Sequence, residues 1–311
     1  MLNVHEILTR HPKNPVLDPD DYPGTRTLFN PSPVAYNGKT ILLVSRNLFS
    51  GGPGGRTFVA ESEDGVAFKL RDEPLISRET LPPPFNQCRH FIDNRISKIE
   101  DTYYILTPVG SSYGSASVIL GKTTDWESYE PISIICPPNN RGASMFQGKI
   151  GGKYYKLDRP GAGTGSYGTI WISSSPDMLH WGNFRPLLYP GFTRWSNVKI
   201  GPTPPIPTPD GWLEIIHGVS HPGDGYHYYV GAMLLDREDP TRIVGLMHTP
   251  LLKPEASYEV RGNCGNVVFP CGAIGDVEKD EFRLYYGGAD TYICLATGKL
   301  SDIVEACRKE L

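Results

Sequence analysis

The feature that most constrains the fold is a segment that occurs five times, a tight polar turn followed by a strand of alternating aromatic and aliphatic residues. The turns lie near residues 37–38, 100–101, 151–152, 210–211 and 279–280. Asn-Gly, Gly-Gly and Asp-Gly pairs tolerate positive φ and close two-residue β-hairpins. The turns recur about every 50–70 residues, close to the ~40–50 residues of a propeller blade. This repeat predicts an all-β, five-bladed β-propeller.

We expect one domain over residues 1–311, with five blades of four strands each and a short C-terminal helical cap over 302–311. A second turn signal, Ser or Thr followed two residues later by Asp, marks the outer hairpin of three repeats, at Asp64, Asp125 and Asp177. The 34 Gly, 29 Pro and 17 Tyr suit short strands and many turns. A Rossmann fold is excluded because no glycine-rich strand-to-helix turn occurs.

Charge and hydropathy exclude other classes of function. The net charge of −4, with no basic run, argues against nucleic acid as a partner. No stretch approaches the ~18 apolar residues of a membrane span, and residues 1–30 carry no apolar export signal. We therefore expect a cytoplasmic protein without a membrane partner. The six cysteines lack zinc spacing, so we expect no metal and no disulfide.

Polar residues at the ends of the inner strands are the candidate functional residues, because inner strands line the central channel of a propeller. They are Asn30, Arg46, Asp93, Arg95, Arg141, Lys149, Arg159, His217 and Asp290. Each could alone be a structural residue. Several charges in one register would nevertheless be costly to bury without partners. The arginines suit an oxyanion such as phosphate, and the Tyr and Trp residues suit the apolar faces of sugars. The channel is therefore predicted to bind a sugar and an anion.

Ordered motifs along nearly the whole chain resemble glycoside hydrolase family 130, the inverting mannoside phosphorylases and β-1,2-mannosidases. The motifs include Phe29-Asn30 before YNGK, IDNRI at 92–96, FQGK before IGGKYYKLDRP at 146–160, SSSPDMLHWG at 173–182, NVKIG at 197–201, NVVFP at 266–270 and YYGGAD at 285–290. The family fold is a five-bladed propeller, in agreement with the repeat.

The resemblance implies roles for the candidate residues. Asp93 would be the general acid, passing its proton through the mannose 3-hydroxyl as family members do. The residues implied to hold the sugar are Asn30, Arg46, Arg95 and Asp290. Those implied to surround phosphate are Arg141, Lys149, Arg159, His217 and Tyr226. The expected partners are a small oligosaccharide, inorganic phosphate as co-substrate and no cofactor, with a homo-oligomer possible.

Some positions depart from the family pattern. Ile92 and Asn94 replace Glu and Pro of the family's Glu-Asp-Pro-Arg motif, Gly142 stands where phosphorylases often have Asn, and Gln147-Gly148 replaces a Pro-containing pair. An apolar Ile92 should raise the pKa of Asp93 and suit a proton donor. We also expect Arg95 to point at a neighbouring blade rather than at the Asp93 carboxyl.

Three functions are compatible with these residues. An inverting hydrolase needs a second carboxylate to activate water, whereas a phosphorylase needs only the acid and cations to position phosphate. The arginines at 141 and 159 favour phosphorolysis of a β-mannoside to mannose 1-phosphate over phosphate-independent β-mannosidase activity. The third possibility, a glycan-binding propeller without catalysis, predicts near-equivalent sites in the blades, and the polar residues of the repeats differ.

Overall fold

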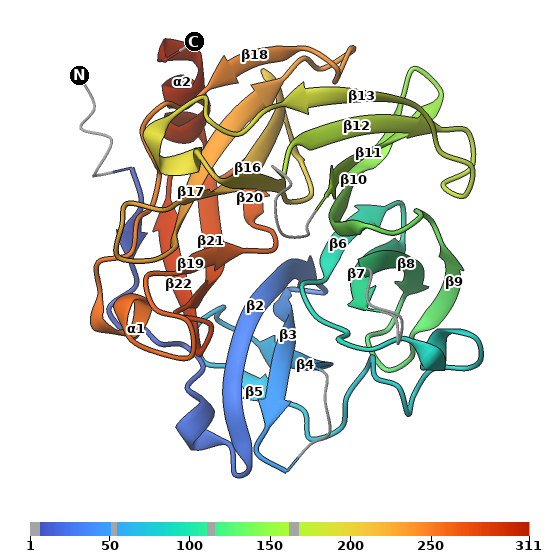
Figure 1. Cartoon of the computed structure of the whole chain (residues 1–311), viewed down its shortest axis with the longest axis vertical. Helices are drawn as coiled ribbons and strands as arrows, with labels where there is room; N and C mark the ends of the chain where they lie inside the picture. The colour runs from blue at the N-terminus through green and yellow to red at the C-terminus, as the bar shows by residue number, and fades with distance from the viewer. Residues whose placement is uncertain (1–6, 51–54, 111–115, 162–167, 311) are drawn as a thin grey trace.

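The computed structural model describes residues 7–50, 55–110, 116–161 and 168–310. Over these residues the strands form five antiparallel sheets. Figure 1 shows the sheets following one another round a ring in the order of the sequence, so the molecule is a five-bladed β-propeller, as the repeat predicted.

The first three blades have four strands each, as expected. Blade 1 consists of β2 (Thr25–Tyr36), β3 (Lys39–Leu48), β4 (Arg56–Ser62) and β5 (Lys69–Leu70). Blade 2 consists of β6 (Arg95–Ile99), β7 (Thr102–Gly110), β8 (Ala116–Thr123) and β9 (Glu130–Ile134). Blade 3 consists of β10 (Asn140–Ile150), β11 (Lys153–Pro160), β12 (Ile170–Ser175) and β13 (Gly182–Leu188).

Blades 4 and 5 differ from the expected four strands because the innermost strand of each is divided in two. Blade 4 consists of β14 (Lys199–Pro202), β15 (Ile206–Thr208), β16 (Gly211–Ser220), β17 (His227–Leu235) and β18 (Ile243–Leu246). Blade 5 consists of β19 (Val268–Pro270), β20 (Ile274–Asp276), β21 (Glu281–Gly288), β22 (Tyr292–Gly298) and β1 (Thr9–Arg10). In blade 4 the chain between the two halves is Thr203-Pro204-Pro205, and proline cannot donate a ladder hydrogen bond.

The five predicted turns join the innermost strand of each blade to the next strand. Several turn residues have positive φ, including Asn37 (48°), Glu100 (55°) and Asp280 (53°). Because the paired strands are antiparallel, each turn closes one end of its blade. The start of the first strand and the end of the second therefore lie together at the opposite end, where the candidate site residues are concentrated.

The outer hairpins are held by an aspartate that accepts backbone hydrogen bonds. Asp64 Oδ1 accepts from the amides two and three residues later, both at 2.8 Å, and Asp125 and Asp177 do the same. These bonds lower the pKa of Asp64 to about 2. Asp236 in blade 4 makes the same pair of contacts, although Leu234 stands where the motif has Ser or Thr.

The hydrophobic core is distributed between neighbouring blades. Ile41 and Val59 of blade 1 pack with Ile105 of blade 2, and similar clusters join the later blades in turn. A last cluster, including Leu42 and Tyr285, joins blades 5 and 1. Each blade therefore buries both of its faces against its neighbours, which fixes the ring.

The ring is closed by β1, which pairs with β22 at the outer edge of blade 5. Arg10 of β1 binds Glu259 through Nε at 2.7 Å and Nη2 at 2.9 Å. Glu259 is fully buried and also accepts a hydrogen bond from Tyr286 at 2.7 Å. The N-terminal segment is thus attached to the C-terminal blade by both backbone and charge.

Among the residues that the structure describes, two helices pack against blades 4 and 5. The cap predicted at 302–311 is α2 (Leu300–Lys309), which begins two residues earlier, and residue 311 lies outside the described residues. Its buried face, with Ile303 and Cys307, packs against blades 4 and 5. The single-turn α1 (Ser257–Val260) was not predicted. The described loops contain the 3₁₀ turns η2 (Pro19–Asp21), η3 (Phe85–Gln87) and η4 (Arg194–Ser196). No helix in these ranges is long and apolar enough to cross a membrane.

Candidate active site

Asp93 and Asn30 meet at the end of the blades opposite the hairpin turns. Asn30 Nδ2 donates to Asp93 Oδ1 at 2.5 Å, and both side chains are buried. Asn30 lies at a register shift between β2 and β3, and Asp93 lies two residues before β6. Both have positive φ, 51° and 58°, as has Asp290 at 48°. Non-glycine residues with positive φ are uncommon and cluster at functional sites, so this grouping marks a candidate site.

Arg95 points away from the Asp93 carboxyl, as predicted, but it reaches across the channel to blades 4 and 5 rather than to a neighbouring blade. Its Nε donates to the carbonyl of Pro202 in blade 4 at 3.2 Å, and its Nη1 lies 2.8 Å from Cys271 Sγ. The guanidinium also lies 5.8 Å from the ring centre of Phe269 in blade 5. A further bond runs from Nη1 to the backbone carbonyl of Asp93 at 2.5 Å. Arg95 therefore supports the backbone at Asp93 and joins three blades. These contacts use guanidinium N–H groups that, by the family resemblance, were expected to bind the sugar.

Arg141, Arg159 and Lys199 form a group of cations beside the two aspartates. Burial and the charge of Arg141 lower the pKa of Arg159 to about 10. Burial, Arg159 and Arg141 lower the pKa of Lys199 to about 8, although Asp93 and Asp290 oppose the shift. None of the three cations forms a salt bridge with a carboxylate in the described part of the chain. Cations that destabilise one another in this way favour an anionic ligand.

Asp290 follows β21 in blade 5, and its pKa is affected by Asp93 and by the same cations. Burial and the neighbouring Asp93 raise its pKa to about 6, and Arg141 and Lys199 act in the opposite direction. Asp290 therefore lies close enough to Asp93, Arg141 and Lys199 for their charges to affect its pKa.

His217 is fully buried beside the cations, an environment that favours its uncharged form. Burial and the charges of Arg159 and Arg95 hold its pKa well below the usual value. Neither ring nitrogen has a hydrogen-bond partner among the described residues, and its ring lies 4.5 Å from that of Phe269. A neutral imidazole can donate from one nitrogen and accept at the other, so His217 can bind phosphate or a hydroxyl group.

Tyr228 is the hydroxyl residue of this cluster, and Tyr226 is not. Tyr226 is 56 % exposed and packs against His221. The ring of Tyr228 lies 5.0 Å from Lys199 Nζ, and burial with the charge of Asp290 raises its pKa to about 12. The structure therefore brings Tyr228, and not the expected Tyr226, to the cationic group.

The lysine beside the two arginines is Lys199, which was not among the candidates. The lysine expected to bind phosphate was Lys149. Lys149 is exposed, lies over the ring of Tyr154 at 4.9 Å and stands beside the turn at 151–152. It follows Arg141 by eight residues of β10, roughly 25 Å along a strand. Lys199 instead begins β14, at the end of the blade that carries the site. The start of an inner strand was the signal that could have identified it.

Arg46 is also separate from the cluster. Its Nε donates to Thr25 Oγ1 at 2.9 Å and its guanidinium lies 4.9 Å from the ring centre of Phe58, so these contacts remain within blade 1. Its neighbour Ser45 points to the opposite face of β3 and accepts a hydrogen bond from the Asp93 amide at 3.2 Å. Strand alternation thus brings Ser45, not Arg46, to the acid.

Two of the unusual motif residues have clear structural contacts. Asn94 is fully buried, donating to Thr57 Oγ1 at 2.6 Å and accepting from Thr107 Oγ1 at 2.8 Å. It joins blades 1 and 2 directly behind Asp93. At Gly142 a Cβ atom would lie 3.2 Å from Arg159 Nε. The glycine therefore leaves Arg159 uncrowded on that side.

Of the eight buried polar side-chain atoms without a partner among the described residues, four belong to the site. They include Asn30 Oδ1, Arg159 Nε and both ring nitrogens of His217. Most buried polar atoms in native proteins have a hydrogen-bond partner, and exceptions require an explanation such as a ligand or ordered water. A bound sugar and an anion would offer hydrogen-bond partners to these atoms.

Comparison with known proteins agrees with this geometry. The profile of glycoside hydrolase family 130, described as β-1,4-mannooligosaccharide phosphorylase, matches residues 4–309. The β-1,2-mannobiose phosphorylase of Listeria innocua is 37% identical over 255 residues, covering 81% of this chain and 68% of the relative. The β-1,4-mannooligosaccharide phosphorylase of Ruminococcus albus is 29% identical over 313 residues, covering 96% of this chain and 90% of the relative.

Solved structures give the same result. The Listeria innocua β-1,2-mannobiose phosphorylase, in complex with β-1,2-mannobiose, superposes with a TM-score of 0.86 at 30% identity, covering 97% of this chain and 99% of that chain. The chain belongs to glycoside hydrolase family 130, the family of the β-mannoside phosphorylases.

Proposed function

We propose that this protein cleaves a β-mannoside by phosphorolysis with inversion, releasing mannose 1-phosphate. The observation that carries the proposal is the group formed by Arg141, Arg159 and Lys199, which lies beside Asp93 and has no carboxylate in salt-bridge contact among the described residues. Phosphate would satisfy these cations. It is already an anion, so it needs positioning rather than a base.

In the proposed reaction a phosphate oxygen forms a bond to the anomeric carbon of mannose while the bond to the leaving oxygen breaks. Asp93 supplies the proton that the leaving oxygen takes up, through the mannose 3-hydroxyl if the relay of the family applies. Asn30 and Arg95 hold Asp93 in place through its carboxylate and its backbone carbonyl respectively. His217 and Tyr228 provide neutral hydrogen-bonding groups beside the cations.

The main rival is an inverting β-mannosidase, in which a second carboxylate activates water. Asp290 is the candidate for that carboxylate, since its pKa is raised to about 6 and it lies within the influence of Asp93. The same fold, at 21% identity, occurs in a structure from work on family 130 hydrolases that target β-1,2-mannosidic linkages. The fold alone therefore does not separate the two reactions.

The test is to incubate the protein with β-1,2-mannobiose, β-1,4-mannobiose and 4-O-β-mannosyl-glucose, with and without phosphate. NMR of the anomeric proton and phosphorus would identify the product. We expect α-mannose 1-phosphate, formed only when phosphate is present. Free mannose released at the same rate without phosphate would establish the hydrolase instead, and binding without any product would establish a glycan-binding propeller.

We also propose that the reaction takes place in the cytoplasm. A phosphorylated sugar is charged and would be retained there for further metabolism, which makes phosphorolysis useful in that compartment. Fractionation of the source cells, with the protein detected by antibody, would test the location.

A further inference from the structure

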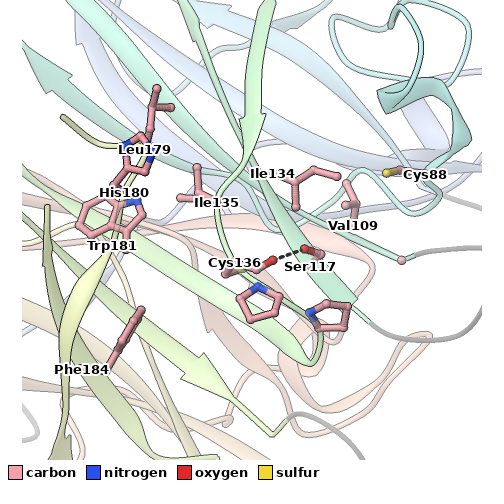
Figure 2. Close-up of a pocket in the computed structure, with 13 residues that line it drawn as sticks. Cys88, Val109, Ser117, Ile134, Ile135, Cys136, Leu179, His180, Trp181 and Phe184 are labelled. Atoms are coloured by element: carbon pink, nitrogen blue, oxygen red, sulfur yellow. Dashed lines mark hydrogen bonds between the residues drawn. The ribbon is translucent and has the colours of Figure 1, made fainter.

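A large apolar groove lies between blades 2 and 3, outside the cationic cluster. Its volume is about 750 Å³. Figure 2 shows Trp181 and Phe184 on one side, from the β12–β13 hairpin, and Ile134 and Val109 of blade 2 on the other. The volume is within the range of ~300–1,000 Å³ that is usual for ligand sites.

Three large apolar side chains in the walls of this groove are exposed to solvent. Phe184 is 54 % exposed, Ile134 45 % and Leu179 43 %. Trp181 is held in position because its Nε1 donates to the carbonyl of Met178 at 2.8 Å and Lys156 Nζ lies 5.0 Å from its ring centre. Clustered apolar side chains on an exposed surface usually mark a binding site.

The groove adjoins a cavity that reaches towards the candidate active site. A second cavity of about 360 Å³ is lined by His90, Ile92 and Arg141, and it shares Val109 and Gly110 with the groove. Ile92 directly precedes Asp93, and Arg141 belongs to the cationic group. Val109 and Gly110 therefore lie between the cavity beside Arg141 and the groove beside Trp181 and Phe184.

We propose that this groove binds the distal sugar units of a mannooligosaccharide whose terminal mannose lies in the active site. The inference rests on the proposed function, because the general acid must face the leaving group, and Ile92 beside it lines the adjoining cavity. Sugar rings present apolar C–H faces that pack on aromatic and aliphatic side chains. The groove would thus favour substrates that are longer than a disaccharide.

The test compares substrates of different length in the Phe184→Ala variant. Phe184 lies on the edge strand β13 and is largely exposed, so its truncation should leave the fold intact. We expect the ratio of kcat/KM for mannopentaose to kcat/KM for mannobiose to fall between about twofold and tenfold, the loss of one aromatic contact. Both β-1,2- and β-1,4-linked series would be used. The matched control is Val277→Ala, another exposed apolar residue, in blade 5.

Calorimetric binding of mannopentaose separates this proposal from the proposed reaction. Weaker pentaose binding by Phe184→Ala than by Val277→Ala supports the groove even if the parent protein forms no mannose 1-phosphate. Equal length ratios and equal pentaose affinities in both variants overturn it. A parent dimer that Phe184→Ala converts to monomer, with unchanged pentaose affinity, also overturns it and assigns the groove to a second copy of the chain.

Discussion

Replacing Asp93 by Asn tests the general acid because the two side chains have nearly the same size. Asn readily adopts the left-handed backbone conformation that Asp93 has, with φ of 58°. Its side-chain oxygen can still accept the hydrogen bond from Asn30. What the variant lacks is an acidic group that can give up and take back a proton.

The expected losses of stability and of rate differ in size. Changing a charge-assisted hydrogen bond to a neutral one costs about 1 kcal/mol of folding free energy. Loss of general acid catalysis lowers the rate by about 10²–10⁴-fold, equivalent to ~3–5 kcal/mol in the barrier. The variant should therefore remain folded and bind substrate, with turnover reduced at least about a hundredfold.

The assay combines phosphate-dependent release of mannose 1-phosphate with thermal unfolding of the same samples. Titration gives a further readout, because Asp93 contributes to the raised pKa of Asp290 and its removal should lower that pKa. The assignment would be refuted if the variant lost thermal stability while its folded fraction turned over at the parental rate. Asp93 would then be a structural residue.

Three further predictions concern the anion site and the ring closure. Arg159→Ala should raise the KM for phosphate about 10-fold or more. The melting temperature should not fall, because no described carboxylate forms a salt bridge with Arg159. An unchanged KM would exclude Arg159 from the phosphate site. The phosphorolysis rate should be highest between about pH 6 and pH 8, falling below as Asp290 is protonated and above as Lys199 loses its charge, whereas a Lys199→Gln variant should lose the alkaline limb. Arg10→Ala should lower the free energy of unfolding by about 3 kcal/mol because Glu259 would be left buried without its partner, and chemical denaturation measures this loss.

The sequence by itself determined the architecture and much of the acid site. Five polar turns fixed the number of blades, since each turn closes a hairpin whatever its tertiary surroundings. Asn30, Asp93 and Asp290 stand where an inner or second strand of their blades begins, bulges or ends, so the repeat was sufficient to identify them as candidates. The family motifs then identified Asp93 as the acid expected by resemblance.

Only the tertiary structure decided which cations and hydroxyls share the site. Lys149 and Lys199 are both basic residues of an inner strand, yet they lie at opposite ends because β10 ends where Lys149 stands and β14 begins at Lys199. Tyr228, rather than Tyr226, enters the cluster because the chain joins β17 after residue 226. A strand's direction and pleat set which end and which face a side chain occupies, and these are fixed only when the blades pack round the ring.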